Sequence, residues 1–312
     1  MIIDVHTHIC ALGRGGMTSE RLIRSPAFRF MRWWLGIHGE RSTWPAQLET
    51  AMLRTIDESG LDKAAILAFD AVHREDGTRD DANTHLYVEN DYVAELAARN
   101  AKVLFGASIH PYRRDAVGEL ERCVKMGAVL VKWLPLTQVM NPANPRCFPF
   151  YEAMAHHRIP LLCHTGGEQT LTAPDRTVRD PARLLPALQR GVTVIAAHCG
   201  TRSLWWEESY LETFCEMAKQ HERFYGDTAA ITLPTRNYCL KRLLSDAQVR
   251  GKLVHGSDWP VVSWPPVRHL GLLQSWRSLR ERNWMKRDIL IKKQLGLDDA
   301  YWHRVASILR LP

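Results

Sequence analysis

Short apolar runs recur along the whole chain, and a segment with the spacing of a helix follows each of them. Runs of this length, rich in β-branched residues and bounded by turn residues, are typical of β-strands. The pattern therefore predicts eight strands, at residues 2–8, 63–69, 102–109, 128–134, 160–165, 192–198, 223–228 and 252–258.

The segments between these strands predict helices. One helix begins near Pro45, which suits a first helical position, and ends at Gly60. Others are predicted at 115–126 and 181–190, and the tail from residue 265 to 312 has helical spacing, with Leu270, Leu273, Trp276 and Leu279 on one stripe. Residues 9–45 are predicted to be a long loop insertion after the first strand.

Strands that alternate with helices indicate an α/β fold, and eight of them indicate a (β/α)8 TIM barrel. A doubly wound sheet shows a similar alternation. However, only closure into a barrel would bring together the ends of the first, fourth, fifth, sixth and eighth strands. We expect one domain over residues 1–312, with extra helices at the carboxyl terminus and the active site at the carboxyl ends of the strands.

Composition narrows the class of protein. The chain has 312 residues, 46% of them hydrophobic, and no apolar run approaches the ~18 residues that a membrane span needs. Its seven cysteines are scattered and odd in number, which predicts reduced thiols in a cytoplasmic protein without a signal peptide. The net charge of +7 is spread along the chain, so we expect a small anionic substrate and neither a nucleic acid nor a membrane as partner. A homo-oligomer is left open.

Polar residues able to bind a metal stand at the carboxyl ends of five predicted strands. They are His6, His8, Lys132, His164, His198 and Asp258. Side chains two apart on a strand share a face, so His6 and His8 present two imidazoles side by side. Each of the six has an ordinary structural role available to it, such as capping a turn or bonding the backbone. Their coincidence on one rim indicates a metal site.

These motifs resemble the amidohydrolase superfamily, in particular the type 2 group that includes aminocarboxymuconate-semialdehyde decarboxylase. The matching pieces are Asp4-Val-His6-Thr-His8, Val131-Lys132, Leu162-Cys-His164-Thr-Gly166, Ala197-His198-Cys-Gly200 and His255-Gly-Ser-Asp258-Trp-Pro260. The resemblance implies a TIM barrel that holds one or two divalent metals, usually zinc.

By the same resemblance His6, His8, His164 and Asp258 would hold one metal, and Asp258 would also take a proton from the attacking water. His198 would bind a second metal or stabilise developing negative charge. In binuclear members of the superfamily the lysine at the end of the fourth strand is carboxylated and bridges two metals. Lys132 is such a lysine, so the metal count stays open.

The resemblance and the chemistry together predict a hydrolase that cleaves a lactone, ester or amide through a metal-activated water. The main alternative is a metal-dependent decarboxylase of an aromatic or muconate-type acid. A catalytically inactive barrel that serves as a scaffold is a third reading, but no expected ligand is missing. Candidate substrate-binding residues are Arg29, Arg32 and Glu168, because arginine suits a carboxylate and the tryptophans of the first insertion could stack on a ring.

Overall fold

The computed structural model describes residues 1–311 and contains one large sheet of eight parallel strands. Each of the eight predicted strands is present, and each lies beside the next in chain order. Their buried positions are apolar on both faces, as expected for strands covered by helices outside and by side chains inside. The strands are β1 (Ile3–His8), β3 (Lys63–Leu67), β5 (Val103–Ala107), β6 (Ala128–Trp133), β7 (Leu161–His164), β8 (Val194–Ala197), β9 (Phe224–Asp227) and β10 (Leu253–Val254).

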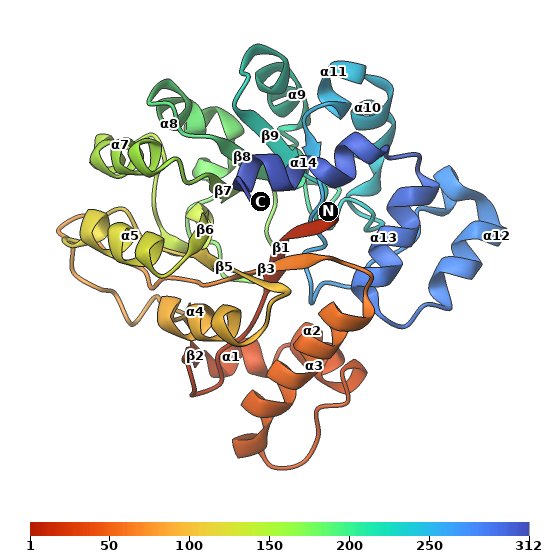
Figure 1. Cartoon of the computed structure of the whole chain (residues 1–312), viewed down its shortest axis with the longest axis horizontal. Helices are drawn as coiled ribbons and strands as arrows, with labels where there is room; N and C mark the ends of the chain where they lie inside the picture. The colour runs from red at the N-terminus through yellow and green to blue at the C-terminus, as the bar shows by residue number, and fades with distance from the viewer. Residues whose placement is uncertain (312) are drawn as a thin grey trace.

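The sheet closes on itself where the chain after β10 meets β1. The backbone N–H of Val5 donates to the carbonyl of His255 at 3.1 Å, and that of Asp258 donates to the carbonyl of His6 at 2.9 Å. A third bond, from the N–H of His8 to the carbonyl of Trp259, measures 2.7 Å. The TIM barrel is thereby confirmed, and Figure 1 shows its helices arranged around the strands.

Helices cover the outside of the barrel between consecutive strands. The longer predicted helices are all found, with ends within a few residues of their predicted limits. The helices that follow β1 to β9 are α3 (Trp44–Glu58), α4 (Asn90–Arg99), α5 (Ala116–Lys125), α6 (Pro135–Gln138), α7 (Phe148–His157), α8 (Leu185–Gln189), α9 (Leu211–Gln220), α10 (Leu240–Ser245) and α11 (Ala247–Arg250), with 3-10 turns η2 (Pro145–Cys147), η3 (Thr177–Arg179), η4 (Pro181–Leu184), η5 (His198–Gly200) and η6 (Asn237–Cys239).

The insertion after β1 is more ordered than the loop that its sequence predicts. It contains β2 (Gly16–Thr18), α1 (Glu20–Ile23), α2 (Pro26–Trp34) and η1 (Arg41–Thr43). β2 pairs antiparallel with β4 (Leu86–Val88), which anchors the insertion to the loop after β3. The hydroxyl of Ser19 caps α1 and that of Ser25 caps α2. Two serine caps therefore mark the beginnings of helices within a segment that was predicted from the sequence to be a loop.

Three helices follow β10: α12 (Val267–Leu279), α13 (Trp284–Gln294) and α14 (Asp299–Leu309). α14 closes the amino-terminal end of the barrel, where Val305, Ile308 and Leu309 join the apolar cluster inside the strands. The amino terminus lies beside it, with the nitrogen of Met1 2.6 Å from Nδ1 of His303 (Figure 1). The strands point toward the opposite end of the barrel, where the candidate site lies. Within residues 1–311, no helix is long and apolar enough to cross a membrane.

The stripe predicted for α12 is only partly right. Leu270 is buried, but Leu273, Trp276 and Leu279 are 61%, 57% and 41% exposed, and the helix packs through Ser275 and Ser278 instead. Gly271, with a φ of 76°, breaks the helix and rotates the second part relative to the first. The predicted stripe assumed that one helical period continues through Gly271. It therefore predicted the wrong buried face for the second part of α12.

Candidate metal centre

Two imidazoles meet at the carboxyl end of β1. The Nε2 atoms of His6 and His8 lie 2.9 Å apart. On its other side, Nδ1 of His6 lies 2.7 Å from Oδ2 of Asp227, the last residue of β9. We assign the ring hydrogen of His6 to Nδ1, because a carboxylate can only accept. Nε2 of His6 then keeps a lone pair that points into the barrel mouth.

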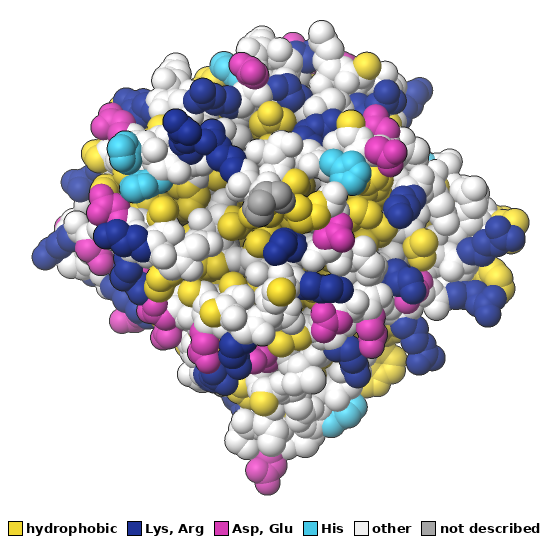
Figure 2. Space-filling model, viewed as in Figure 1, with side chains coloured by type: hydrophobic (Ala, Val, Ile, Leu, Met, Phe, Trp, Pro, Cys, Tyr) yellow, Lys and Arg dark blue, Asp and Glu magenta, His cyan; other side chains and the backbone are white. Residues whose placement is uncertain are grey.

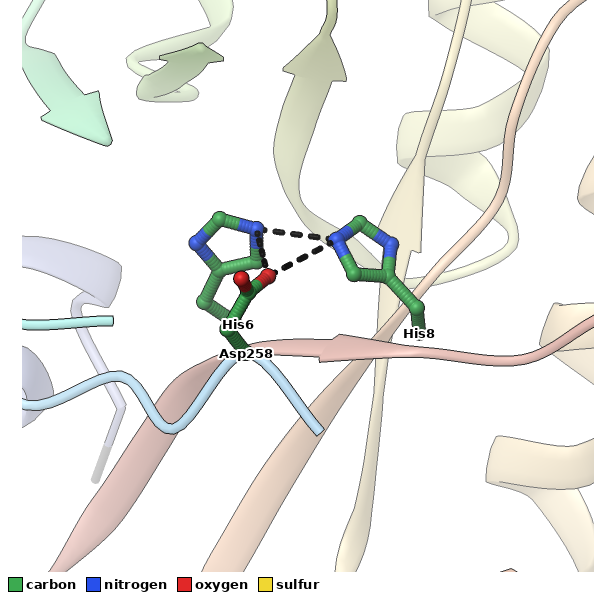
Figure 3. A group of neighbouring side chains, drawn as sticks. All are labelled: His6, His8 and Asp258. Carbon is green, nitrogen blue, oxygen red and sulfur yellow. Dashed lines mark hydrogen bonds and ion pairs between the residues drawn. The ribbon is translucent and has the colours of Figure 1, made fainter. Parts of the chain in front are cut away.

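Asp258 completes a compact group with these two histidines. Its Oδ1 lies 3.3 Å from Nε2 of His6 and 3.4 Å from Nε2 of His8, and one ligand atom from each residue falls within 4.8 Å of the others. Figure 3 shows the three side chains turned toward one another. Burial tends to raise the pKa of Asp258, but His6 and His8 outweigh it and hold that pKa below its ordinary value. Asp258 is therefore an ionised carboxylate, ready to bind a cation.

Asp258 and His198 both hold an unusual backbone conformation. Their φ angles are 67° and 61°, in the left-handed region that residues other than glycine seldom occupy. Such a conformation costs on the order of 1–2 kcal/mol, and residues that keep it cluster at functional sites. His198 directly follows β8 and Asp258 lies four residues after β10, and at both positions this backbone conformation sets the direction of the side chain.

Lys132, at the end of β6, belongs to the same cluster. Its side chain is fully buried, and Nζ lies 3.0 Å from Nε2 of His6. Since that nitrogen carries a lone pair, Nζ donates to it. Burial lowers the pKa of Lys132, partly opposed by Asp227 and Asp258. The sequence placed this lysine in the site, and the structure brings it into contact with the first histidine.

His198 lies next to the group, with its ring 5.2 Å from that of His6 between centroids. Nδ1 of His198 donates to the carbonyl of Ala229 at 2.8 Å, so its Nε2 carries a lone pair. Burial lowers the pKa of this imidazole well below its usual value, with a further contribution from Arg236. The ring is therefore neutral and offers an acceptor, not a donor.

His164 stands at the end of β7, beside His198 and outside the group of three. The rings of His164 and His198 are 4.7 Å apart between centroids. Nε2 of His164 lies 3.2 Å from the carbonyl of Gly167, and Nδ1 lies 3.8 Å from Oε2 of Glu168. His164 therefore presents Nδ1, not Nε2, as its free nitrogen. Its role as a metal ligand stays a prediction.

The three predicted substrate-binding residues occupy different surroundings. Glu168 is buried beside His164; its Oε1 accepts the N–H groups of Thr170 and Leu171, and burial raises its pKa. Arg29 is exposed on α2, and the guanidinium of Arg32 stacks 4.0 Å from the centre of the Trp44 ring. Only Glu168 thus lies near the histidines, while a substrate role for all three stays a prediction.

Two residues of the site, Asp227 and Arg236, were not identified from the sequence. Asp227 holds His6 and also accepts the N–H groups of His198 and Ala229. It ends a predicted strand, so the rule that identified Asp258 could have found it. Arg236 lies in the loop after β9 and bonds the loops after β7 and β8. Nothing in its local sequence indicates this position.

The donor set fits a divalent metal such as zinc. Two neutral imidazoles and a carboxylate are ligands that zinc accepts, and a second carboxylate behind a ligating histidine is a common supporting contact. Side chains of His8 and Asp258 are 23% and 13% exposed, so an ion and a substrate can reach them. All seven cysteines are free, and none belongs to this group.

Comparison with known proteins gives one family and several similar folds. An uncharacterized TIM-barrel protein from Bordetella bronchiseptica has a TM-score of 0.62 at 15% identity, over 95% of this chain and 100% of that chain. A Pseudomonas putida protein assigned as 2-pyrone-4,6-dicarboxylic acid hydrolase has a TM-score of 0.60 at 12% identity, over 99% and 97%. The 2,6-dihydroxybenzoate decarboxylase from Rhizobium has a TM-score of 0.56 at 13% identity, over 99% and 98%.

At these identities the similar structures show the fold alone. Comparison with curated proteins found no match. The family model described as Amidohydrolase, however, matches residues 3–271, a span that runs from β1 past Asp258 and so includes every residue of the site. This chain therefore belongs to the amidohydrolase family.

Proposed function

We propose that the protein is a metal-dependent hydrolase that opens a lactone, ester or amide bond in a small anionic substrate with a ring. The observation that carries this proposal is the convergence of His6, His8 and Asp258, whose ligand atoms lie within 4.8 Å of one another at the open end of the barrel. Sites at this end of a TIM barrel are where its enzymes act.

The residues fit one divalent metal, with zinc as the proposed ion. His6, His8 and Asp258 would hold it, and His164 would join through a rotation of its ring. A metal in this position would supply a nucleophilic water at neutral pH and would polarise the bond under attack.

Asp258 is the proposed general base. Its lowered pKa keeps it ionised, and its second carboxylate oxygen is left to take the proton of the attacking water. Lys132 is the proposed donor to the developing oxyanion. The hydrogen that Nζ now donates to His6 loses its acceptor once that nitrogen binds a cation, which leaves Lys132 free to donate to substrate.

A second metal would require carboxylation of Lys132. The lowered pKa of this lysine favours the neutral amine, which is the form that adds to CO2 with loss of a proton. His198 would then serve as a ligand, since its Nε2 lone pair is free. With one metal, the same lone pair would accept a hydrogen from water or substrate, because a neutral Nε2 without hydrogen cannot stabilise an oxyanion.

The proposed substrate carries a carboxylate on or near a ring. The Pseudomonas putida and Rhizobium proteins of similar fold are named for 2-pyrone-4,6-dicarboxylic acid and 2,6-dihydroxybenzoate, both anionic ring compounds. Glu168, beside His164, could bond a substrate hydroxyl, and Arg29 and Arg32 are the proposed outer contacts for an incoming anion. A rise in KM without a change in kcat in Arg29→Met would support the outer role.

The test combines metal analysis with product analysis. Purified protein would be assayed for metal per chain and for turnover of 2-pyrone-4,6-dicarboxylate, aryl esters and 2,6-dihydroxybenzoate in water labelled with oxygen-18. We expect about one metal per chain, label in a new carboxylate, and loss of both turnover and metal in Asp258→Asn. Carboxylation of Lys132 would be read by carbon-13 NMR after addition of labelled bicarbonate.

Each other outcome changes the assignment. Release of CO2 from 2,6-dihydroxybenzoate, with no labelled carboxylate from any ester, would replace the hydrolase by the decarboxylase. Full activity in Asp258→Asn, or after complete removal of metal, would exclude the metal-dependent mechanism.

A further inference from the structure

Two arginines are buried in this protein without an acidic partner. Arg236 and Arg287 are 5% and 3% exposed. Among the described residues, no carboxylate oxygen lies within 4.0 Å of either guanidinium. A buried charge without a counter-ion is costly unless other groups satisfy it. The two arginines differ in how many of their guanidinium nitrogens have a hydrogen-bond acceptor.

Arg287, on α13, is fully engaged by backbone carbonyls. Its Nε and Nη2 donate to the carbonyl of Glu281, Nη1 donates to that of Ser263, and Nη2 donates also to that of Leu279. All three nitrogens therefore have acceptors. This arginine fastens the chain between α12 and α13 and has no edge left for a ligand.

Arg236 keeps one edge of its guanidinium free. Nη1 donates to the carbonyl and the hydroxyl of Thr201 at 3.0 and 2.8 Å, and Nη2 donates to the carbonyl of Gly167 at 2.6 Å. Nε donates no hydrogen bond to any of residues 1–311. This nitrogen is not fully buried, so solvent can reach it. Nε and the second hydrogen of Nη2 are the pair of donors that a carboxylate could take.

The guanidinium of Arg236 lies beside His164, one of the histidines at the mouth of the barrel. The carbonyl of Gly167 that Arg236 binds also lies 3.2 Å from Nε2 of His164. The shared carbonyl thus places the guanidinium next to His164, whose ring is 4.7 Å from that of His198 between centroids. The charge of Arg236 also contributes to the lowered pKa of His198 and opposes the rise in the pKa of Glu168 that burial causes.

The loops around Arg236 are packed too tightly to move apart easily. A Cβ added at Gly166 would come within 2.1 Å of the carbonyl oxygen of Thr201, and one at Gly167 within 2.4 Å of the N–H of Ser203. The loops after β7 and β8 are thus in direct contact, and Arg236 reaches both from the loop after β9. A charge held this rigidly loses little entropy when it binds an anion.

We infer that Arg236 forms a carboxylate subsite, which binds a substrate carboxylate that does not react. This inference rests on the proposed function and adds a substrate class to it. The carboxylate would lie at the β7–β9 side, while the bond to be cleaved meets His6, His8 and Asp258 at the β1–β10 side. The substrate is then a carboxylate-substituted cyclic ester or amide, with the acid and the reacting carbonyl on different ring positions.

The test is a binding measurement that needs no turnover. Isophthalate, an aromatic dicarboxylate that cannot be hydrolysed, and its neutral isostere isophthalamide would be titrated by calorimetry into the protein as purified, with metal content measured on each sample. We expect isophthalate to bind more tightly than isophthalamide. Arg236→Met should weaken isophthalate roughly 10- to 100-fold, as expected for a lost charge-assisted pair, and leave isophthalamide and metal content unchanged.

Arg287→Met is the matched control, because it removes a second buried arginine that donates to carbonyls. It should lower the urea midpoint of unfolding and leave isophthalate binding unchanged. Arg236→Lys keeps the charge without the planar fork, and it should fold and lose part of the affinity. If Arg236→Met does not fold, Arg236→Lys and the preference of the wild type decide the question.

Unchanged isophthalate affinity in either Arg236 variant, or equal affinity of the wild type for the two probes, would overturn the subsite. So would an equal loss for both probes, which would make Arg236 a structural clamp alone. The proposed function can fail separately. A protein that hydrolyses no ester but binds isophthalate through Arg236 would retain the subsite and lose the hydrolase assignment.

Discussion

Two buried clusters of the same residue types lie on either side of one short segment, His255–Asp258. The open cluster consists of His6, His8, Lys132 and Asp258, at the mouth of the barrel. The closed cluster consists of His255, Asp288, Lys292 and Tyr301, between the strands and helices α13 and α14. Each combines histidine, aspartate and lysine, and most of the side chains are buried, although those of His8 and Asp258 are partly exposed.

The clusters differ in what their polar atoms face. In the closed cluster, Nζ of Lys292 donates to Asp288 and, at 2.7 Å, to the carbonyl of Gly256, while the hydroxyl of Tyr301 pairs with that of Thr228 at 2.6 Å. Donors meet acceptors there except at Nε2 of His255, which has no partner within residues 1–311, and every member is at most 1% exposed.

In the open cluster, Nε2 of His6 and Oδ1 of Asp258 are acceptors, and Nε2 of His8 becomes a third acceptor when its ring hydrogen lies on Nδ1. Lys132 is the one neighbour whose side chain can only donate. Converging lone pairs repel, and a cation relieves this repulsion. Residue type and burial therefore do not distinguish a metal site from a structural network. Acceptor atoms that converge, at a position open to solvent, distinguish the metal site.

Removal of both paired histidines should have the largest effect. His6→Ala with His8→Ala deletes two of the three converging ligands, so we expect no metal uptake and a loss of turnover beyond about 1,000-fold, measured by metal analysis and steady-state kinetics. His156→Ala with His157→Ala, a side-by-side pair at the end of α7, is the control and should keep both. Retained activity in the first variant would show that the open cluster is not the site.

The two buried lysines should respond in opposite ways. Lys292→Met leaves Asp288 without its partner. It should lower the unfolding free energy by about 3–5 kcal/mol and leave the metal content unchanged. Lys132→Met should lower turnover with a smaller loss of stability, since it removes the proposed donor to substrate and leaves no ion-paired carboxylate without its partner. Urea denaturation, metal analysis and kinetics would be run on both variants. The same pattern of losses in both would remove the distinction between the clusters.

Asp227→Asn should weaken metal binding without deleting a ligand. The amide that replaces the carboxylate holds His6 less firmly and no longer raises the basicity of its Nε2. We expect about a 10- to 100-fold rise in the metal Kd, measured by competition with a chelator. Asp180→Asn, which alters a half-buried carboxylate that caps η4, is a control and should leave metal binding unchanged.

The closed cluster should produce a small dependence of stability on pH. Burial raises the pKa of Asp288 to about 6, although Lys292 and Ser263 oppose the rise. The folded protein thus binds this proton more tightly than the unfolded chain, whose value is 3.8. The stabilising contribution is complete below the unfolded pKa and is lost as pH rises through about 6.

Between pH 5 and pH 6 the unfolding free energy of the wild type should therefore fall by roughly 1 kcal/mol relative to Asp288→Asn, which lacks this titration. Urea unfolding of both proteins at half-unit steps of pH measures the difference. A constant difference across this range would show that Asp288 is ionised throughout and that the cluster is a simple ion pair.

Local patterns in the sequence were enough to predict the eight strands and, within four residues, the positions where they end. Apolar runs such as Lys63–Leu67 and Ala128–Trp133 are local features, and the rule that TIM barrels place their chemistry after the strands then selected His6, Lys132 and Asp258. The same reasoning failed where the chain departs from a period. Gly271 breaks α12, so most of the predicted stripe is exposed, and the helices that begin after Ser19 and Ser25 were predicted to be part of a loop.

Contacts between distant parts of the chain determine which side-chain atoms of the predicted residues face one another. Asp227 sets the hydrogen of His6 on Nδ1, and the contact of His164 with Gly167 leaves its Nδ1 free. Arg236 gains its position from bonds to Gly167 and Thr201, dozens of residues away in the chain. A local pattern records which face of an element is buried. The register between distant strands, which it does not record, determines where lone pairs and charges meet.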